Sequence, residues 1–332
     1  MFLSIIIPHY NLPRELLEQC LDSITRLDIP AGDYEIIVID DGSAAPPLWI
    51  GEKYRGTSIR LIAAAHGGPG AARNRGIEEA KGTYIEFVDG DDTLIPGSAY
   101  KQCIDKLHSE KPQVLHFNYQ VTQPGEKPKS DSGRPVEFSN TISGGTYMKE
   151  FNLPGSPCCY FVQRELLLEK DIRFPENIFH EDEEFNTMLH FHARTLVHSN
   201  ATLYNYRIRQ GSTTANSSRQ FEEQRIEDML CIIEHLALFR DTQTACGAIQ
   251  RQGLAHKLAT LGVDAILNML YTGMSAREIR EKCRKRLGPI GIYPLPRAAY
   301  SMKYRIFRLL ANSKCGMGAL RLLIPSQKPA KQ

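Results

Sequence analysis

The segment Tyr84-Ile85-Glu86-Phe87-Val88-Asp89-Gly90-Asp91-Asp92 joins a short apolar run to three carboxylates within four positions. The apolar run is rich in β-branched and aromatic residues, which predicts a buried strand. Burying carboxylates this close together is costly unless a cation lies among them. Mg²⁺ and Mn²⁺ suit oxygen ligands best, so the segment indicates a metal site at a strand end. A solvent-exposed acidic turn is the alternative, because Asp and Gly are ordinary turn residues.

The chain around this segment alternates apolar runs with helical spacing. Strands are predicted at 2–7, 34–39, 58–63, 84–88 and 114–119, and helices at 14–27, 71–81 and 96–110. Such alternation predicts an α/β fold with βαβ units and a mainly parallel sheet. Polar segments follow three of these strands, at 9–11, 40–43 and 89–92. Because parallel strands end at one edge of a sheet, we expect the three segments to converge on one crevice.

The second half of the chain does not continue the alternation of strands and helices. Short strands are predicted at 158–163, 196–197 and 202–206. From residue 221 onward the spacing is helical, over about 221–240, 246–271, 275–286, 300–310 and 317–324. We therefore expect an α/β body followed by a helical extension.

Composition narrows the class of protein. The 332 residues are 42% hydrophobic and 23% charged, which is ordinary for a globular protein. Eight cysteines occur without a C-x-x-C spacing, so free cytosolic thiols are expected rather than zinc or disulfide sites. The first eight residues lack a basic region, and no apolar stretch reaches 18 residues. We accordingly expect neither a signal peptide nor a membrane-spanning segment, and a cytoplasmic location.

Two familiar motifs are only approximated. A dinucleotide-binding strand would be followed by G-x-G-x-x-G, but Pro8-His9-Tyr10-Asn11 has no glycine, and Gly68-Pro69-Gly70 leads to Arg73 where the third glycine belongs. His180-Glu181 begins like a zinc-protease helix, but position 184 is Glu instead of His. Neither NAD binding nor zinc hydrolysis is expected.

Two charged clusters have both a functional and a structural interpretation. The four acids at 181–184 open a helix, where carboxylates are favoured by the helix dipole, but one of them is also a candidate general base. Arg207 and Arg209 precede Gly211-Ser212 on an extended segment. They are candidates for closing over a diphosphate, and a solvated basic loop is the alternative.

Six ordered motifs resemble those of family 2 glycosyltransferases, and together they cover about residues 2–213. Four are Ser4-Ile5-Ile6-Ile7-Pro8-His9-Tyr10-Asn11, Ile39-Asp40-Asp41-Gly42-Ser43, Ala72-Arg73-Asn74-Arg75-Gly76 and Phe87-Val88-Asp89-Gly90-Asp91-Asp92. Glu181-Asp182 before Glu184-Phe185, and Tyr206-Arg207-Ile208-Arg209-Gln210-Gly211-Ser212, are similar to the later signatures. The chain departs from the pattern at His9, where an aliphatic residue is commoner, and at Gly67-Gly68-Pro69, which replaces Asn-x-Gly.

The resemblance implies a GT-A fold, with a Rossmann-like, mainly parallel sheet flanked by helices. It implies a catalytic domain over 1–215, made of a nucleotide-sugar half (1–119) and an acceptor half (120–215), before the helical basic region 216–332. The implied reaction is inverting transfer from a nucleotide-diphosphate sugar, expected to be a UDP-sugar. The implied acceptor is a hydroxyl of a glycan or lipid-linked molecule in cell-surface polysaccharide synthesis, with Mn²⁺ or Mg²⁺ as cofactor.

By the same resemblance, individual residues take roles in donor binding. The nucleotide would be held by Pro8, Tyr10, Asn11, Asp41, Arg73 and Asp89. Of these, Asp41 would bind the base.

The remaining implied roles concern the metal, the diphosphate and the acceptor. Asp89 and Asp91 would form the D-x-D metal pair, with Asp89 toward ribose or metal-bound water. Arg207 and Arg209 would contact the diphosphate, and Asp182 would be the catalytic base. Asp92 stays open as a partner of the metal ligands or only a helix cap.

The chemistry of sugar transfer needs two kinds of carboxylate. A metal stabilises the negative charge that develops on the leaving diphosphate, and a base accepts the proton of the attacking hydroxyl. A nucleotidyltransferase is one alternative, although it typically has a G-x-G-rich loop after its first strand. A non-catalytic nucleotide-sugar-binding protein would need Asp41 and Asp91 but not Asp182.

The C-terminal region is strongly basic. Residues 277–325 hold twelve Lys or Arg residues against two acids, whereas the whole chain has a formal charge of only +2. The segment 300–310 mixes cations with bulky apolar residues, as an interfacial helix does. We expect peripheral binding to an anionic inner membrane surface, with a helix packed on the body as the alternative. Nucleic-acid binding is not expected, because no recognition motif accompanies the charge.

Overall fold

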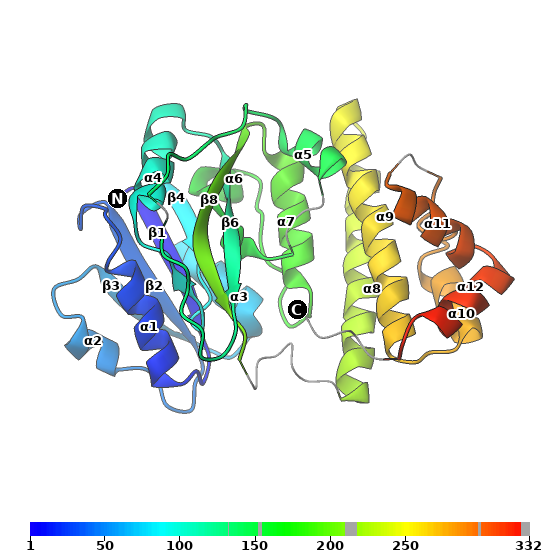
Figure 1. The fold of residues 1–332 in the computed structure, drawn as a ribbon, viewed down its shortest axis with the longest axis horizontal. Helices are drawn as coiled ribbons and strands as arrows, with labels where there is room; N and C mark the ends of the chain where they lie inside the picture. The colour runs from blue at the N-terminus through cyan, green and yellow to red at the C-terminus, as the bar shows by residue number, and fades with distance from the viewer. Residues whose placement is uncertain (132, 152–154, 210–217, 298–299, 327–332) are drawn as a thin grey trace.

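The structure is a computed structural model that describes residues 1–131, 133–151, 155–209, 218–297 and 300–326. Its centre is an eight-stranded sheet of order β3-β2-β1-β4-β7-β6-β8-β5 (Figure 1). The strands are β1 (Leu3–His9), β2 (Tyr34–Asp41), β3 (Ile59–Ala64), β4 (Tyr84–Phe87), β5 (Thr93–Leu94), β6 (Val114–Thr122), β7 (Tyr160–Gln163) and β8 (Leu196–Arg207). The five predicted N-terminal strands are therefore present.

The sheet is parallel in its first half and mixed in its second. Strands β1 to β4 pair in parallel, whereas β7 runs antiparallel to both β4 and β6, and β5 runs antiparallel to β8. The two short strands predicted at 196–197 and 202–206 are one strand, β8. A register shift opposite His116 and Asn118 lets β8 continue past its polar middle. Strict alternation of apolar and polar residues would have predicted one continuous strand. The register shift interrupts that alternation, so the sequence predicted two strands.

Helices cover both faces of the sheet. In the N-terminal half they are α1 (Arg14–Ile24), α2 (Trp49–Lys53), α3 (Gly68–Glu79) and α4 (Ser98–Glu110). The second half adds α5 (Gly144–Glu150), the 3₁₀ turn η1 (Pro157–Cys159), α6 (Arg164–Glu169) and α7 (Glu181–His192). Helix α3 packs closely on β1, because a Cβ atom on Gly76 would lie 2.3 Å from Cγ2 of Ile6. This close packing seats the N-terminal end of α3 beside the end of β1.

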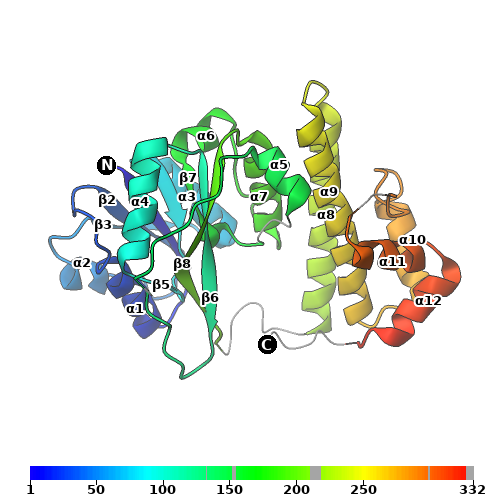
Figure 2. The same ribbon diagram turned by 45° about the horizontal axis from the view of Figure 1, so that its top comes forward.

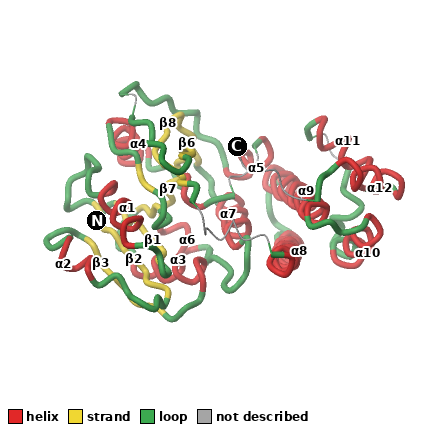
Figure 3. Tube along the Cα trace, turned by 60° about the horizontal axis from the view of Figure 1, so that its bottom comes forward, coloured by secondary structure: helices red, strands yellow, loops and turns green. Residues whose placement is uncertain are grey.

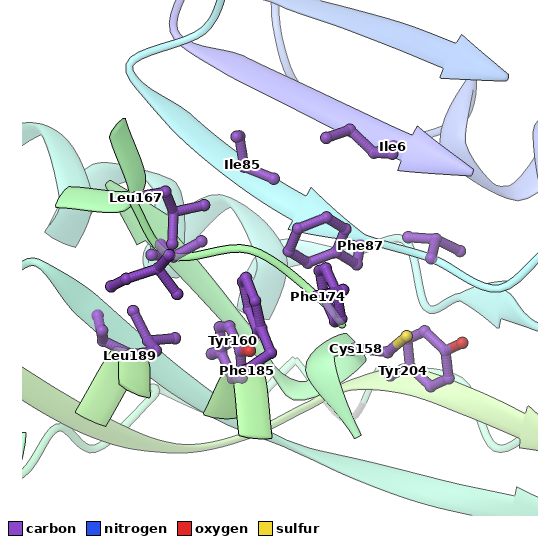
Figure 4. Close-up of a cluster of buried hydrophobic side chains, with 14 of the residues drawn as sticks. Ile6, Ile85, Phe87, Cys158, Tyr160, Leu167, Phe174, Phe185, Leu189 and Tyr204 are labelled. Carbon is purple, nitrogen blue, oxygen red and sulfur yellow. The ribbon is translucent and has the colours of Figure 1, made fainter. Parts of the chain in front are cut away.

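An aromatic cluster fixes α7 against the sheet. Phe87 of β4 makes edge contacts with Phe174 and Phe185, whose rings stack at 3.7 Å (Figure 4). All three side chains are buried. Because Phe87 lies two residues before Asp89 and Phe185 lies on α7, the cluster holds the first turn of α7 near the end of β4.

The C-terminal helices form a second body of structure beside the sheet. Helices α8 (Arg219–Thr242) and α9 (Ala248–Tyr271) lie between α7 and the group α10 (Ala276–Arg286), α11 (Met302–Ala311) and α12 (Lys314–Leu323) (Figure 3). Helix α9 packs on α5, and one buried apolar cluster includes residues of both the sheet and α9. Within the described ranges, no helix is long and apolar enough to cross a bilayer. The predicted boundary at 215 lies outside the described residues.

Candidate active site

The carboxyl ends of β1 and β2 are joined by their loops, as the predicted convergence requires. Pro8 lies in β1 opposite Ile39, and the next register pair is His9 with Asp40. Beyond the strands, the Asn11 N–H donates to Ser43 Oγ at 2.8 Å, and the Ala44 N–H donates to Asn11 Oδ1 at 2.9 Å. Asn11 therefore fixes the shape of both loops.

Asp41 is buried at the end of β2 and organises the loop before α3. Its carboxylate accepts hydrogen bonds from the Gly67 and Gly68 N–H groups at 2.8 and 2.9 Å. Nδ1 of His66 lies 2.9 Å from Oδ2 of the same carboxylate. The His66 ring stacks on the exposed ring of Tyr10 at 4.2 Å. Asp41 thus holds Gly67-Gly68 at the end of β2, and His66 joins the residues predicted at this edge.

The three carboxylates after β4 have different environments. Asp92 is buried and accepts from the Tyr204 hydroxyl at 2.6 Å and from the Arg207 N–H at 2.8 Å. Burial, with help from Asp89 and Asp91, raises the pKa of Asp92 to about 8. Asp92 therefore ties the acidic turn to β8.

Asp89 and Asp91 are partly exposed, and each is paired with an arginine. Arg73 donates to Asp89 Oδ1 at 2.8 Å, and Arg209 donates to Asp91 Oδ2 at 2.6 Å. Between them, a Cβ atom on Gly90 would lie 3.1 Å from the Leu12 side chain, so glycine lets the turn pass closely under the loop after β1. Asp89 and Asp91, and not Asp92, are therefore the carboxylates that a ligand from solvent can reach.

The two predicted diphosphate arginines differ in their freedom. The Arg207 guanidinium donates to the carbonyls of Asp91, Asp92 and Leu16 and to the Gln19 side chain. Its donors therefore hold the acidic turn against α1. The Arg209 guanidinium instead forms an ion pair with the carboxylate of Asp91 and is partly exposed. The motif residues after Arg209, up to Ser212, lie outside the described residues.

Arg73 joins the two halves of the site. Its buried guanidinium donates to Asp89 through one nitrogen and to Glu181 Oε1 at 3.0 Å through another. Burial alone would lower the pKa of Arg73, but the carboxylates of Asp89 and Glu181 more than offset this, so its pKa is raised. The residue predicted for nucleotide binding thus links the acidic turn to the first turn of α7, about 90 residues further along the chain.

The four acids that open α7 reach different partners. Glu181 binds Arg73 of α3, Glu183 binds Lys257 of α9, and Glu184 lies 3.1 Å from His235 Nδ1 of α8. Asp182 differs from these three, because no ion pair within the described residues engages its carboxylate. It remains available for a ligand.

The surroundings of Asp182 raise the pKa of its carboxyl group toward neutral pH. Burial, followed by the charges of Glu181 and Glu183, raises the pKa of Asp182 to about 8, and the cations Arg73 and Lys257 act against this. A carboxylate with such a pKa is suited to accept a proton at neutral to mildly basic pH. Lys257 and His235 were not predicted. For Lys257 the sequence did offer a signal, because this lysine falls among the apolar positions of a long predicted helix.

Comparisons with known proteins agree on the class. Residues 4–171 match the model of Glycosyl transferase family 2, a range that ends before Asp182. The chain is 32% identical over 232 residues to the uncharacterized glycosyltransferase EpsJ of Bacillus subtilis, covering 64% of this chain and 62% of EpsJ. It is 31% identical over 199 residues to the poly(ribitol-phosphate) beta-N-acetylglucosaminyltransferase TarS of Staphylococcus aureus, covering 57% of this chain and 32% of TarS. The chain thus spans less than two thirds of both relatives.

Solved structures share the architecture. S. aureus TarS 1-349 in complex with UDP-GlcNAc superposes with a TM-score of 0.63 at 20% identity, covering 93% of this chain and 91% of that one. The mannosyltransferase PcManGT from Pyrobaculum calidifontis, in complex with GDP-Man and Mn²⁺, gives a TM-score of 0.56 at 16% identity, covering 96% and 86%. At these identities the likeness shows the fold alone.

Proposed function

This chain belongs to glycosyl transferase family 2, and from that membership we propose that it transfers a sugar from a UDP-sugar to a hydroxyl of a cell-surface glycan with inversion. It is a glycosyltransferase, and the expected GT-A fold is confirmed. The UDP-GlcNAc in the TarS complex and the named activity of TarS support the choice of donor and acceptor class. The family match also argues against the alternative that the chain is a nucleotidyltransferase.

One contact carries the proposal, namely the bridge from Asp89 through Arg73 to Glu181. It holds the acidic turn, whose carboxylates would take the metal ion of a nucleotide diphosphate, against the first turn of α7, where Asp182 follows Glu181. Donor and acceptor chemistry therefore share one site. An inverting transfer needs this arrangement, because the base must stand on the side opposite the leaving group.

The donor base would lie at the edge made by β1 and β2. The exposed ring of Tyr10 offers a face for stacking, and the loop that Asp41 holds would form the floor of this pocket. Pro8 lies at the end of β1 on this edge, and Asn11 joins the loops that follow β1 and β2.

The carboxylates of Asp89 and Asp91 fit a hard divalent cation. Each gives one oxygen to an arginine, and within the described residues its other oxygen has no hydrogen bond. Mn²⁺ or Mg²⁺ held by these oxygens would supply Lewis-acid stabilisation of the leaving diphosphate. Arg73 and Arg209 would orient the two carboxylates for that ion.

Replacing Asp91 by Asn should remove the dependence of UDP binding on metal. In the native chain we expect Mn²⁺ to tighten UDP binding by at least about tenfold, and Asp91→Asn to cancel most of that gain. Calorimetric titration of UDP with and without Mn²⁺ measures both. Asp241→Asn, which alters an arginine-paired aspartate on α8, is the matched control. Equal UDP affinity with and without Mn²⁺ in the native chain would count against the metal assignment.

Activity should rise with pH through the pKa of Asp182. Only the deprotonated carboxylate accepts the hydroxyl proton, so kcat/KM should reach half its maximum at about pH 8. Replacing Lys257 by Met removes a cation that lowers this pKa, so the midpoint should move to higher pH. A pH profile of UDP release tests both statements. A midpoint that stays in place in Lys257→Met would contradict the assignment.

A further inference from the structure

Helix α11 presents an apolar face that the rest of the described chain leaves uncovered. Met302, Ile306 and Leu309 are 65%, 54% and 62% exposed, and their spacing places them on one side of the helix. The opposite side is held in the fold, because Tyr304 and Ala311 are buried and the Tyr304 hydroxyl donates to the Pro296 carbonyl at 2.8 Å. The exposed face therefore belongs to a well-packed helix.

Helix α12 also carries exposed apolar side chains near its C-terminal end. Leu322 and Leu323 are 89% and 76% exposed, and α12 packs against α11. Figures 1 and 2 show both helices at the end of the molecule farthest from β2 and β3. Exposed leucines on two packed helices are typical of an interaction surface.

The charges of this region divide into two groups. On α10, Lys282 and Arg286 are neutralised by Glu227 and Glu234 of α8, so that helix is packed on the body as the alternative interpretation expected. On α11, Lys303, Arg305 and Arg308 flank the apolar face and have no carboxylate partner within the described residues. After Glu281 the sequence contains no acidic residue at all.

We propose that the apolar face of α11, flanked by Lys303, Arg305 and Arg308, docks on an anionic membrane. Apolar side chains between cations are what an interfacial helix needs, because the former enter the acyl boundary and the latter meet the headgroups. A second copy of the chain is disfavoured as the occupant, since it would bring unpaired cations against cations. Nucleic acid would use the cations but not the exposed apolar side chains.

Vesicle sedimentation of the full chain tests the docking surface. The native chain should bind vesicles of phosphatidylglycerol and phosphatidylcholine at least about tenfold better than vesicles of phosphatidylcholine alone, and added salt should weaken the binding. Two triple variants, M302S/I306S/L309S and K303Q/R305Q/R308Q, should each lose at least about tenfold. The matched controls are Leu238→Ser and Arg277→Gln, which alter exposed side chains on α8 and α10 and should bind as the native chain does.

Three results would overturn the docking proposal. They are equal binding to both vesicle types, retained binding in both triple variants, and a dimer in light scattering that the apolar variant abolishes. Circular dichroism of each variant confirms that it is folded, which the exposure of the changed side chains leads us to expect. Because vesicle binding needs no transfer activity, failure of the proposed reaction would show as loss of UDP release with docking intact.

Discussion

Replacing Asp182 by Asn should lower kcat by about 10² to 10⁴, the usual contribution of a positioned general base. The amide keeps the size of the side chain but accepts no proton. UDP binding should remain close to native, because the donor side of the site is built from β1, β2 and the acidic turn after β4. Initial rates of UDP release and calorimetric UDP titration together separate these two effects.

Glu184→Gln is the matched control for this substitution. Glu184 lies two residues further along the same helix and contacts His235 of α8, away from Arg73. We expect near-native turnover from it. Native turnover in Asp182→Asn would remove Asp182 from the mechanism, and equal losses in both variants would indicate damage to α7 instead.

Replacing Arg73 by Met should reduce the free energy of unfolding by about 3 to 5 kcal/mol, the usual cost of removing one partner from a buried ionic group. Asp89 and Glu181 would then face each other without the cation between them. The pKa of Asp182 should also rise, because Arg73 is one of the two cations that lower it. Urea denaturation measures the first effect and the pH profile of UDP release the second.

Arg75→Met on the same helix is the control, since Arg75 pairs with Glu78 and Glu79 in a solvated position. Its cost should stay below about 1 kcal/mol. Adding Glu181→Gln to Arg73→Met should restore part of the lost stability, because one uncompensated charge is removed. Equal losses in Arg73→Met and Arg75→Met would contradict the bridging role.

Most of the parallel half of the sheet was predictable, because β1, β2 and β4 are buried on both faces and appear in the sequence as nearly continuous apolar runs. The mixed half was harder. Strand β8 carries polar residues at its register shift, and α5 begins at Gly144-Gly145, although glycine is a poor helix former. Gly144 is needed there because a Cβ atom would lie 2.1 Å from the His190 carbonyl oxygen. This contact between distant segments leaves no trace in local spacing.

The sequence nominates residues for the candidate site, but it does not show which contacts hold them in place. Motif order placed Asp41, Asp89, Asp91 and Asp182, and strand topology explained why the first three converge. The partners of these residues come from tertiary packing, so the sequence did not show that Arg207 anchors the acidic turn or that α8 and α9 supply His235 and Lys257. The sequence around a charged residue does not indicate which distant residue will pair with it.

The first turn of α7 has a consequence that concerns rotation about its axis. Consecutive residues of an α-helix point about 100° apart, so the four acids face different sides of α7, and three of them reach Arg73 of α3, Lys257 of α9 and His235 of α8. His180, with a φ of 66°, fixes where that circle begins. Changing one of the four acids alters one contact, whereas inserting or deleting one residue before Glu181 would turn all of them together. The contacts of this turn therefore depend on its rotation about the helix axis more than on any one of its acidic residues.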